Sequence, residues 1–587
     1  MSLRKTKIVC TLGPSTDKTE ILEEMVKVGM NVARLNFSHG IYDEQKKRLD
    51  EVKTVSRKLG IPVATLLDTK GPEIRLGCFK NKQVELMQGQ IFRLTTNEIE
   101  GDEESVFVTY SGLPNDVSVG TTILIDDGLI ELVVEKLTEK DISCKVLNGG
   151  FISDRKGVNV PNVKLNMDYI SEKDKNDIIF GIENDFDFIA ASFVRNVNDI
   201  FDVRRILEEN GGEDIQIIAK IENYEGVSNI DDIVKASDGI MVARGDLGVE
   251  IDFEELPQIQ KKLIESGYKA EKKVITATQM LESMIKNPRP TRAEVSDVAN
   301  AVYDGTSAVM LSGETAAGKY PVESLRTMSK IVTEAEKDIN YIKRFNENKL
   351  SVSSSISHAI SHATCTTAHD LNVSAIIVVT KSGYTARAIS SFRPASTIVS
   401  AVTSEKVCRQ LALSWGVYPI MAKEQQSSEE LYEHAVEKAI ETNFIENGDL
   451  VVVTGSSTVG ISGTTNTLKV HLVGNILLRG VGINNLSVYG KVLVAENKEQ
   501  ALEEFTDQDI LVISKTSMDM EEFLKNFKGI VVEQNGASSH GAIVGITLGI
   551  PIIFGATDAT KVLKTGMIVT IESGGGIVYS GIVKIGC

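Results

Sequence analysis

The chain of 587 residues is 42% hydrophobic and 25% charged, a composition typical of folded proteins, and its length predicts about three to four domains. Its formal net charge of −18 would repel a nucleic-acid backbone, so we expect no nucleic-acid partner. No segment offers the roughly 18 to 20 uninterrupted apolar residues of a membrane helix, and the N-terminus shows no signal-peptide pattern, so we expect a cytoplasmic protein with no membrane partner.

The first part of the chain repeats an apolar, β-branched run of about seven residues followed by an amphipathic helical stretch. Such runs occur at residues 7–13, 31–37, 63–69, 186–192, 215–222, 239–245, 274–280 and 308–314. Continuous apolar runs are typical of parallel strands that are buried on both faces. Eight strand–helix units predict an α/β fold with a (β/α)₈ TIM barrel, built from residues 1–69 and 171–345.

Residues 70–170 interrupt this pattern between the third and fourth predicted strands. Hydrophobic and polar residues alternate there, for example at 130–136 and 142–147, and Asp-Asp-Gly and Asn-Gly-Gly turns separate the segments. The alternation predicts a small antiparallel β domain, of the β-barrel kind. Because the insertion follows the carboxyl end of a barrel strand, we expect it to form a lid over the barrel mouth.

Two further segments follow the barrel. Residues 346–473 alternate helical stretches with shorter predicted strands at 374–380, 397–403, 417–422, 449–455 and 468–474. This alternation predicts an α/β domain. A glycine-rich stretch at 474–485 indicates a boundary, and residues 486–587 carry strands of their own. We therefore expect the last segment to form an extra small C-terminal domain.

Polar side chains gather where five of the predicted barrel strands end. In a (β/α)₈ barrel, catalytic groups belong at these ends and in the loops that follow them. The residues found there are Arg34, Asn36, Ser38, His39, Asp68, Thr69, Glu73, Arg75, Lys220, Glu222, Arg244, Gly245, Asp246 and Thr278. Several convergent strand ends predict a site far more strongly than a single charged end would.

Lys220 and Glu222 are two residues apart, so their side chains lie on the same face of one strand. A lysine and a carboxylate that point into a barrel mouth are costly unless they pair or bind a ligand. Asp246 follows the next strand, and two carboxylates together with substrate oxygens suit Mg²⁺. The alternative is a purely structural Lys–Glu pair. The second carboxylate favours a cation-dependent phosphoryl-transfer site.

Groups that attract anions surround these carboxylates in the sequence. Gly245 and Asp246 open a short predicted helix, and helix N-termini bind carboxylate or phosphate. Arg34, Arg75 and Lys156 add positive charge, although each of them alone would also fit a solvated surface.

A second set of residues is rich in oxygen and carries only one formal charge. It consists of Asn36, Ser38, Asp68 and Thr69. Such a cage suits a monovalent cation better than Mg²⁺. The same residues would also serve as ordinary helix caps and turn residues, and their spacing leaves both interpretations open.

Several runs of the chain resemble the pyruvate kinase family. Three of them are highly specific together: AKIEN at 219–223, ARGDLG at 243–248 and TATQML at 276–281. The resemblance covers about residues 1–472 in order, and this family also places its lid after the third barrel strand. It implies transfer of the phosphoryl group of phosphoenolpyruvate to ADP, which gives pyruvate and ATP in the final step of glycolysis.

Roles in the substrate site follow from the same resemblance. Glu222 and Asp246 would hold Mg²⁺ or Mn²⁺, and Lys220 and Arg34 would contact the transferring phosphoryl group. The positions around the substrate carboxylate would be Gly245, Asp246 and Thr278. Thr278, Ser312 or a bound water would protonate the enolate, and the sequence leaves that choice open.

The resemblance also assigns the cation and nucleotide positions. A K⁺ site would be formed by Asn36, Ser38, Asp68 and Thr69. Glu73 is the acidic residue typical of K⁺-dependent members of the family. The nucleotide side of the site would carry Asn36, His39, Arg75 and Lys156.

The turn after the predicted strand at 374–380 resembles the family's sugar-phosphate effector loop. Its phosphate-binding residues would be Thr380, Lys381, Ser382, Gly383 and Thr385. Residues 455–466 resemble the loop that closes over it. Taken alone, the turn at 380–387 also fits an ordinary capped turn. The resemblance implies an allosteric enzyme, regulated by a phosphorylated metabolite and assembled as a homotetramer.

The tail at 536–555 resembles the mobile phosphohistidine domain of phosphoenolpyruvate-utilising enzymes, with His540 at the position of the phosphorylated histidine. Two alternatives to a pyruvate kinase follow. One is an enzyme like phosphoenolpyruvate synthase or dikinase that works through phospho-His540, which would need a nucleotide-binding domain that the sequence does not display. The other is an inactive metabolite sensor. A structural or regulatory tail is the interpretation we favour.

Overall fold

The computed structural model describes residues 3–347, 355–425, 427–456, 465–474, 476–496, 498–504, 510–535, 547 and 549–583. The chain forms two compact units. The first contains Met1–Ser354, Lys381–Ala395 and Val402–Met421, and the second contains Ser355–Thr380, Ser396–Ala401 and Ala422–Cys587. We describe each unit by itself.

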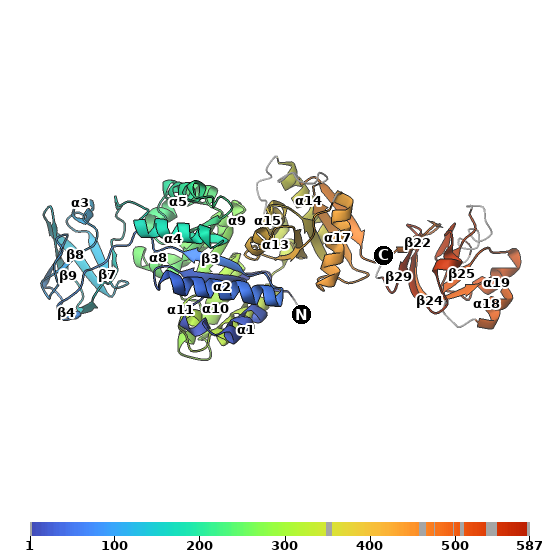
Figure 1. Cartoon of the computed structure of the whole chain (residues 1–587), viewed down its shortest axis with the longest axis horizontal. Coiled ribbons are helices and arrows are strands. Elements are labelled where there is room, and N and C mark those ends of the chain that lie inside the picture. The colour runs from blue at the N-terminus through green and yellow to red at the C-terminus, as the bar shows by residue number, and fades with distance from the viewer. Residues whose placement is uncertain are drawn as a thin grey trace. The chain divides into compact units, whose positions relative to one another are not determined.

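Eight parallel strands close into a barrel in the first unit, in the order β1-β16-β15-β14-β13-β12-β3-β2 (Figure 1). Their bounds are β1 Lys7–Thr11, β2 Val32–Asn36, β3 Ala64–Asp68, β12 Phe188–Ala191, β13 Gln216–Ile221, β14 Gly239–Ala243, β15 Lys273–Ala277 and β16 Ala308–Leu311. Each strand falls within or one residue from its predicted run. The predicted (β/α)₈ barrel is confirmed.

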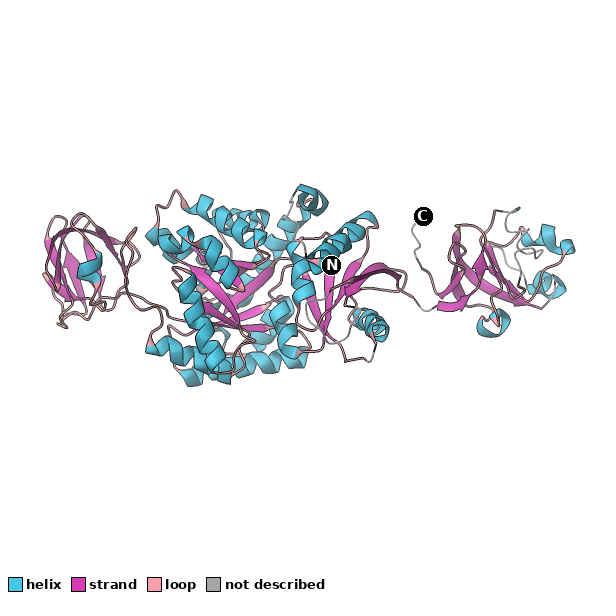
Figure 2. Cartoon of the chain, turned by 90° about the horizontal axis from the view of Figure 1, so that it is seen from above, coloured by secondary structure: helices cyan, strands magenta, loops and turns pink. Residues whose placement is uncertain are grey.

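Helices surround these strands, as the cyan and magenta elements of Figure 2 show. The longer ones are α1 Thr19–Val28, α2 Tyr42–Leu59, α4 Glu172–Glu183, α5 Val197–Glu209, α9 Leu256–Lys269, α10 Arg292–Asp304 and α12 Pro321–Lys337. Shorter helical segments are η1 Pro14–Thr16, α6 Tyr224–Ser228, α7 Ile230–Ala236, α8 Arg244–Glu250, η2 Glu282–Ile285, α11 Gly313–Ala316 and α13 Tyr341–Glu347.

Two kinds of core hold the barrel together. Side chains such as Val9, Leu66 and Met241 fill its interior. Outward-facing residues of the strands pack against the helices in two large clusters. The strands are therefore buried on both faces, which explains why their sequences read as continuous apolar runs.

The insertion forms a β domain with its own core of residues such as Phe92, Ile123 and Leu132. Its elements are β4 Gln83–Leu86, β5 Ile91–Thr95, β6 Ser105–Phe107, α3 Leu113–Asp116, β7 Thr122–Ile125, β8 Ile130–Leu137, β9 Asp141–Val146, β10 Gly150–Ser153 and β11 Val158–Asn159. Six strands follow the order β11-β7-β8-β9-β5-β6, and β10 pairs with β4. The pairings are antiparallel as predicted, except that β5 and β6 are parallel, because residues 96–104 carry the chain back to the same end.

Three later elements pack with the barrel in the first unit. They are α15 Tyr384–Ser391, α16 Glu405–Leu411 and β19 Val417–Met421. Arg409 Nε lies 2.9 Å from a carboxylate oxygen of Asp187, and Gln410 Nε2 donates to the carbonyl oxygen of Asp214 at 2.7 Å. Asp187 lies one residue before β12 and Asp214 two residues before β13, so these elements pack where the strands begin.

In the second unit, four strands lie in the order β18-β17-β20-β21. Their bounds are β17 Ala375–Val379, β18 Thr397–Val402, β20 Leu450–Gly455 and β21 Thr467–Leu472. The β21 strand is antiparallel and the others are parallel. Helices α14 Ile356–Asp370 and α17 Ser428–Glu441 belong to the same segment. The predicted alternation of strands and helices is confirmed.

An eight-stranded sheet forms the last part of the second unit, in the order β22-β29-β28-β24-β25-β26-β27-β23. Its strands are β22 Ile476–Arg479, β23 Val481–Gly482, β24 Ser487–Ala495, β25 Ile510–Ile513, β26 Gly529–Val532, β27 Ile552–Phe554, β28 Ile568–Glu572 and β29 Ile577–Ser580. Short helical segments accompany it: α18 Lys498–Glu504, η3 Met518–Met520, α19 Glu521–Leu524 and α21 Ala559–Val562. The stretch 474–485, expected as a boundary, thus contributes β22 and β23 to the sheet.

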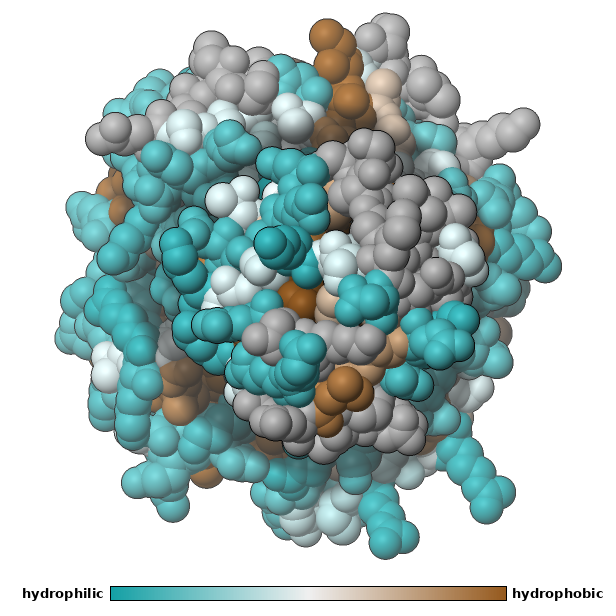
Figure 3. Space-filling model, turned by 90° about the vertical axis from the view of Figure 1, so that its right-hand side faces the viewer, coloured by the Kyte–Doolittle hydropathy of each residue, from teal (hydrophilic) through white to brown (hydrophobic). Residues whose placement is uncertain are grey.

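The face of the molecule drawn in Figure 3 is mostly hydrophilic among the residues that are coloured, and its hydrophobic residues form small separate patches. Scattered patches of this size are ordinary on protein surfaces. Within the described ranges, no helix has the length and apolar character needed to cross a membrane.

Candidate active site

Lys220 lies at the centre of a buried charge cluster at the carboxyl end of β13. Its ammonium Nζ is 3.0 Å from Asp68 Oδ1 and 3.0 Å from Glu222 Oε1, and it donates to Ser192 Oγ at 2.7 Å. Arg34 Nε donates to the other oxygen of Asp68 at 2.5 Å. Strands β2, β3 and β13 and the end of β12 thus supply two cations and two carboxylates to one point, as their predicted positions at strand ends required.

The electrostatics of this cluster are dominated by burial and by mutual pairing. Burial alone would lower the pKa of Lys220, but the carboxylates of Asp68 and Glu222 outweigh it and raise that pKa well above its ordinary value. Burial would likewise raise the pKa of Asp68, which Arg34 and Lys220 instead hold low. Lys220 and Asp68 therefore stay charged at neutral pH.

Glu222 differs from its neighbours. Its side chain is almost wholly buried, and burial raises its pKa to about 8, with Lys220 opposing the shift and Asp246 adding to it. The backbone N–H of Phe193 donates to Glu222 Oε2 at 2.6 Å and fixes the carboxylate in place. A cation bound beside Glu222 and Asp246 would lower the pKa of Glu222 and favour its ionised form.

Asp246 lies in the first turn of α8, directly after β14. Thr278 is next to it: its Oγ1 accepts a hydrogen bond from the Gly245 N–H at 2.7 Å. Thr278 and the following Gln279 both have positive φ, +67° and +52°. Such backbone conformations are uncommon for these residue types and recur at functional sites. Gly245, Asp246 and Thr278 are thus brought together as predicted.

The predicted monovalent cation set also comes together, because β2 and β3 pair with Asn36 opposite Asp68. Asn36 Oδ1 accepts from the Ser38 N–H at 3.1 Å, and the Thr69 N–H donates to the carbonyl oxygen of Ala190 at 3.1 Å. Oxygen atoms dominate this corner, and Asp68 supplies its single formal charge. Both oxygens of Asp68 also face Arg34 and Lys220, so the cation corner and the Lys220 cluster share one carboxylate.

Of the predicted nucleotide residues, Asn36 lies opposite Asp68 in the cation corner, and two others are already paired with acidic side chains. Arg75 forms a bidentate pair with Glu73, with N–O distances of 2.8 and 2.6 Å. Lys156 Nζ is 2.8 Å from Asp126 Oδ1. His39 is exposed. A polyphosphate would therefore have to compete with acidic partners for Arg75 and Lys156.

A cavity of about 460 Å³ lies between the inserted domain and the barrel. Its lining includes Glu73, Asp127 and Asn159 from the insertion side and Asn223 and Asp246 from the barrel side. Asn159 Nδ2 also donates to Glu250 Oε1 of α8 at 2.7 Å, which ties the two parts together. This volume fits a small-molecule site.

Three contributors were missed by sequence reasoning. Ser192 bridges Lys220, Asp68 and the carbonyl oxygen of Thr69. The backbone N–H of Phe193, whose φ is +54°, orients Glu222. Asp127 has a raised pKa, first because of burial and then because of Asp246. The polar Ser192 at the end of an apolar strand was a readable signal, whereas a backbone N–H leaves none.

In the part of the chain that the structure describes, no group of three or more His, Cys, Asp or Glu side chains is arranged to hold a metal ion. The predicted Mg²⁺ ligands Glu222 and Asp246 would offer two carboxylates. Such a set suits Mg²⁺, which usually keeps several water or substrate oxygens as ligands.

The predicted effector loop follows β17. Gly383 caps α15 with φ +75°, a left-handed conformation that favours glycine. The Ser382 carbonyl oxygen accepts from Arg387 Nη1 at 3.0 Å. Thr385 is buried in the first turn of α15 and Lys381 is exposed. The second effector loop at 455–466 lies largely outside the described residues, and His540 lies wholly outside them.

Comparison with protein families places most of the chain. Residues 3–325 match the pyruvate kinase barrel domain, and residues 358–471 match the pyruvate kinase alpha/beta domain. Residues 505–576 match the mobile domain of PEP-utilising enzymes.

Relatives match over nearly their full length. The chain is 48% identical to a pyruvate kinase of Bacillus licheniformis, over 99% of both chains. It is 47% identical to that of Geobacillus stearothermophilus, over 98% of this chain and 99% of the relative. A crystal structure of a pyruvate kinase from Cryptosporidium parvum is 42% identical, with a TM-score of 0.76, and covers 80% of this chain and 96% of its own. From the closed barrel, the Lys220 cluster and these matches together, we conclude that the chain belongs to the pyruvate kinase family.

Proposed function

We propose that this pyruvate kinase transfers the phosphoryl group of phosphoenolpyruvate to ADP, giving pyruvate and ATP, in the presence of Mg²⁺ (or Mn²⁺) and K⁺. One observation carries the proposal: the buried ammonium of Lys220 is held between Asp68 and Glu222 at the mouth of the barrel. A fixed cation of this kind stabilises developing negative charge without reorganising during the reaction.

The residues divide the work by charge. Glu222 and Asp246 would hold the divalent cation, which when bound neutralises charge on the phosphoryl oxygens and the enolate. Arg34 and Lys220, which both pair with Asp68, would contact the transferring phosphoryl group. Lys220 would also stabilise the departing enolate oxygen.

The residues that follow β14 and β15 would orient the substrate. The Gly245 backbone, Asp246 and Thr278 would surround the substrate carboxylate. The hydrogen bond from Gly245 to Thr278 supports this role, because it fixes both groups in one geometry. Thr278 or Ser312 would lie on the path of the proton that converts the enolate to pyruvate; Ser312 Oγ is buried and makes no hydrogen bond to a described residue.

The monovalent cation would bind among Asn36, Ser38, Asp68 and Thr69. Its proximity to Lys220 through the shared Asp68 carboxylate supports a role in setting the charge of the phosphoryl site. Asn36, His39, Arg75 and Lys156 would serve the nucleotide. Displacement of Glu73 and Asp126 from Arg75 and Lys156 by ADP would then couple nucleotide binding to a rearrangement of the lid.

The regulatory assignments are proposals of the same kind. Residues 70–170 would act as the lid, 346–473 as the effector domain and 486–587 as an extra structural or regulatory domain of a cytoplasmic homotetramer. A phosphorylated effector would bind at Thr380, Lys381, Ser382, Gly383 and Thr385.

The test mixes purified protein with phosphoenolpyruvate, ADP and Mg²⁺, in K⁺ or in Na⁺ alone, and follows pyruvate. We expect turnover that is faster in K⁺. Equal rates in the two salts would remove the K⁺ site, and no pyruvate in any cation would refute the activity. His540→Ala should leave turnover intact. Loss of turnover in this variant would favour the route through a phosphohistidine.

A further inference from the structure

A second cavity lies at the other end of the barrel, where the strands begin. It measures about 220 Å³ and is lined by the residues before β14, β15 and β16 and by α15 and the segment that follows α16. All of these elements belong to the first compact unit. Tyr384 at its edge is exposed, so the cavity is open to small solutes. No residue of the proposed active site lines it.

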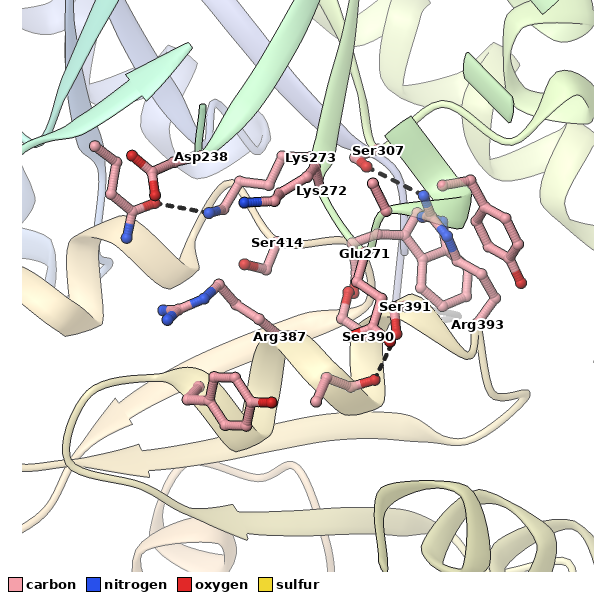
Figure 4. Close-up of a pocket in the computed structure, with 16 residues that line it drawn as sticks. Asp238, Glu271, Lys272, Lys273, Ser307, Arg387, Ser390, Ser391, Arg393 and Ser414 are labelled. Atoms are coloured by element: carbon pink, nitrogen blue, oxygen red, sulfur yellow. Dashed lines mark hydrogen bonds between the residues drawn. The ribbon is translucent and has the colours of Figure 1, made fainter. Parts of the chain in front are cut away.

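Four basic side chains line this cavity: Lys272, Lys273, Arg387 and Arg393. Figure 4 shows Lys272, Lys273 and Arg387 reaching from the barrel and from α15 into one space. Lys272 and Lys273 each donate one hydrogen bond to a neutral oxygen, at 2.7 Å, to Ser237 O and Gln216 Oε1. Each ammonium has three N–H donors, so both have donors left for a ligand.

Acidic side chains do not balance this charge. Asp238 and Glu271 are the acidic residues in the lining. Asp238 is already engaged, since Arg204 Nη2 lies 2.9 Å from its Oδ2 and the Ile217 N–H donates to the same oxygen. A buried cation that lacks a carboxylate partner is costly, which favours an anion in the cavity.

Unused hydrogen-bond donors point to the same conclusion. Arg393 is 6% exposed, and Nη2 alone donates, to Gly305 O and Ser307 Oγ at 3.0 and 3.1 Å. Its Nε and Nη1 have no hydrogen-bond partner among the described residues. The hydroxyl of Ser414, 2% exposed, also lacks one there. Figure 4 shows Ser414 between Lys273 and Arg387, facing the open space.

The pKa of Lys273 is lowered to about 7, mainly by burial and then by Arg387 and Lys272, while Asp238 opposes the shift. Burial also lowers the pKa of Arg387. These directions are what a group of buried cations acquires when no anion lies among them.

We propose that this cavity is a binding site for a phosphate group, carried by inorganic phosphate or by a small phosphomonoester. A dianion there would accept from the two lysines, from the planar fork of Arg387 and from Ser414, all of which have the chemistry that recognises phosphate. It would also lie at the junction of the barrel with α15. No residue of the proposed active site lines the cavity, so the proposal does not rest on the catalytic assignments. Arg387 also donates through Nη1 to the Ser382 carbonyl oxygen in the neighbouring effector turn.

Trp415 makes the site directly observable, because it is the chain's single tryptophan and lines the cavity. The Arg393 guanidinium lies 4.6 Å from its ring centroid. The experiment titrates the full chain with inorganic phosphate and, separately, with glycerol 3-phosphate at constant ionic strength, following tryptophan fluorescence. We expect a saturable change. A tighter response to the ester would identify a phosphomonoester as the ligand, and a response to phosphate alone would identify the free ion.

Two variants locate the response. Lys273→Met and Arg387→Gln should each weaken binding roughly tenfold or more, the size of one lost charge-assisted hydrogen bond. The matched control Lys381→Ala, in the effector loop, should keep the response.

Sulfate adds an independent readout, since it stays a dianion over the pH range in which Lys273 titrates. Its binding should raise the pKa of Lys273, so the protein should take up protons on binding near pH 8, and this uptake should vanish in Lys273→Met. No saturable response in the wild type would overturn the proposal. So would a response that survives in both Lys273→Met and Arg387→Gln, or one that is lost in Lys381→Ala alone.

Discussion

Each end of the barrel contains a buried lysine, and the two lysines differ in their neighbours and in their pKa. At the carboxyl end, Lys220 has two carboxylates within 3.0 Å, and Arg34 shares one of them. At the amino end, the ammonium of Lys273 donates to a neutral amide oxygen, its one hydrogen-bond partner among the described residues. The pKa of Lys220 is raised and that of Lys273 is lowered to about 7, although both lysines are buried.

This difference shows that burial alone does not decide what a lysine can do. Desolvation lowers the pKa at both ends, and only the neighbouring carboxylates reverse its sign at Lys220. A lysine that must stabilise a phosphoryl group needs a permanent charge, and the mouth supplies it. In the amino-end cavity, Lys272 and Lys273 have no carboxylate ion-pair partner among the described residues, which is the arrangement expected where an anion comes from solution.

The largest effect should come from removing the paired lysine. Lys220→Ala should lower kcat by roughly 10²–10³-fold or more, about 3–4 kcal/mol, as for the loss of a preorganised charge stabiliser. Pyruvate formation under saturating phosphoenolpyruvate measures it. Lys7→Met is the matched control: Lys7 is equally buried but lies at the amino end of β1 and donates to Val417 O at 2.6 Å. Near-normal turnover in Lys220→Ala would show that its role is wrongly assigned.

Glu222→Gln tests the carboxylate side of the mouth. The amide keeps the shape and the contact with the Phe193 N–H region but removes the charge, so Mg²⁺ activation should shift to concentrations about 10–100-fold higher. The dependence of rate on Mg²⁺ concentration reports it. An unchanged midpoint would mean that the divalent cation binds elsewhere.

The fold was largely predictable because the barrel strands are buried on both faces. Continuous apolar runs such as 215–222 and 239–245 predict buried parallel strands. The polar residues at their carboxyl ends therefore meet at one end of the barrel. Residues 474–485 were harder: β23 is only two residues long and contains Gly482, so no periodicity distinguishes it from a boundary. The antiparallel prediction for β5 and β6 was wrong, because strand direction depends on the path of the connection and not on alternation.

The site residues that lie at strand ends could be predicted from the sequence. Those that are brought together only by tertiary packing could not. Lys220, Glu222 and Asp246 follow from strand periodicity. The N–H of Phe193 has no sequence signal. The amino-end cavity joins Lys273 to Arg387, more than a hundred residues later, and only the packing of α15 against the barrel brings them together.

The pH dependence of the free energy of unfolding should reveal the lowered pKa of Lys273. Lys273 loses its proton near pH 7 in the folded protein but near its ordinary value of 10.5 when unfolded. Between these values the unfolded state binds the extra proton, so stability should rise with pH, by about 1 kcal/mol per unit. Denaturant unfolding of wild type and Lys273→Met should differ in this slope. Equal slopes would mean that Lys273 keeps an ordinary pKa.

The smallest effect should come from an exposed ion pair that belongs neither to the active site nor to the amino-end cavity. Lys235 and Asp232 are 3.2 Å apart with side chains 72% and 71% exposed. Lys235→Ala should change stability by less than about 0.5 kcal/mol and leave turnover and phosphate response unaltered. Thermal unfolding checks this. A larger change would show that global charge, and not local pairing, governs both ends of the barrel.

The most direct test of the catalytic claim follows phosphorus itself. Phosphorus-31 NMR of purified protein with phosphoenolpyruvate, ADP, Mg²⁺ and K⁺ should show the phosphoenolpyruvate signal converting into the γ-phosphate of ATP in equal amount. Phosphate appearing on the protein or free in solution in place of ATP, or an unchanged phosphoenolpyruvate signal, would contradict transfer at the Lys220 cluster.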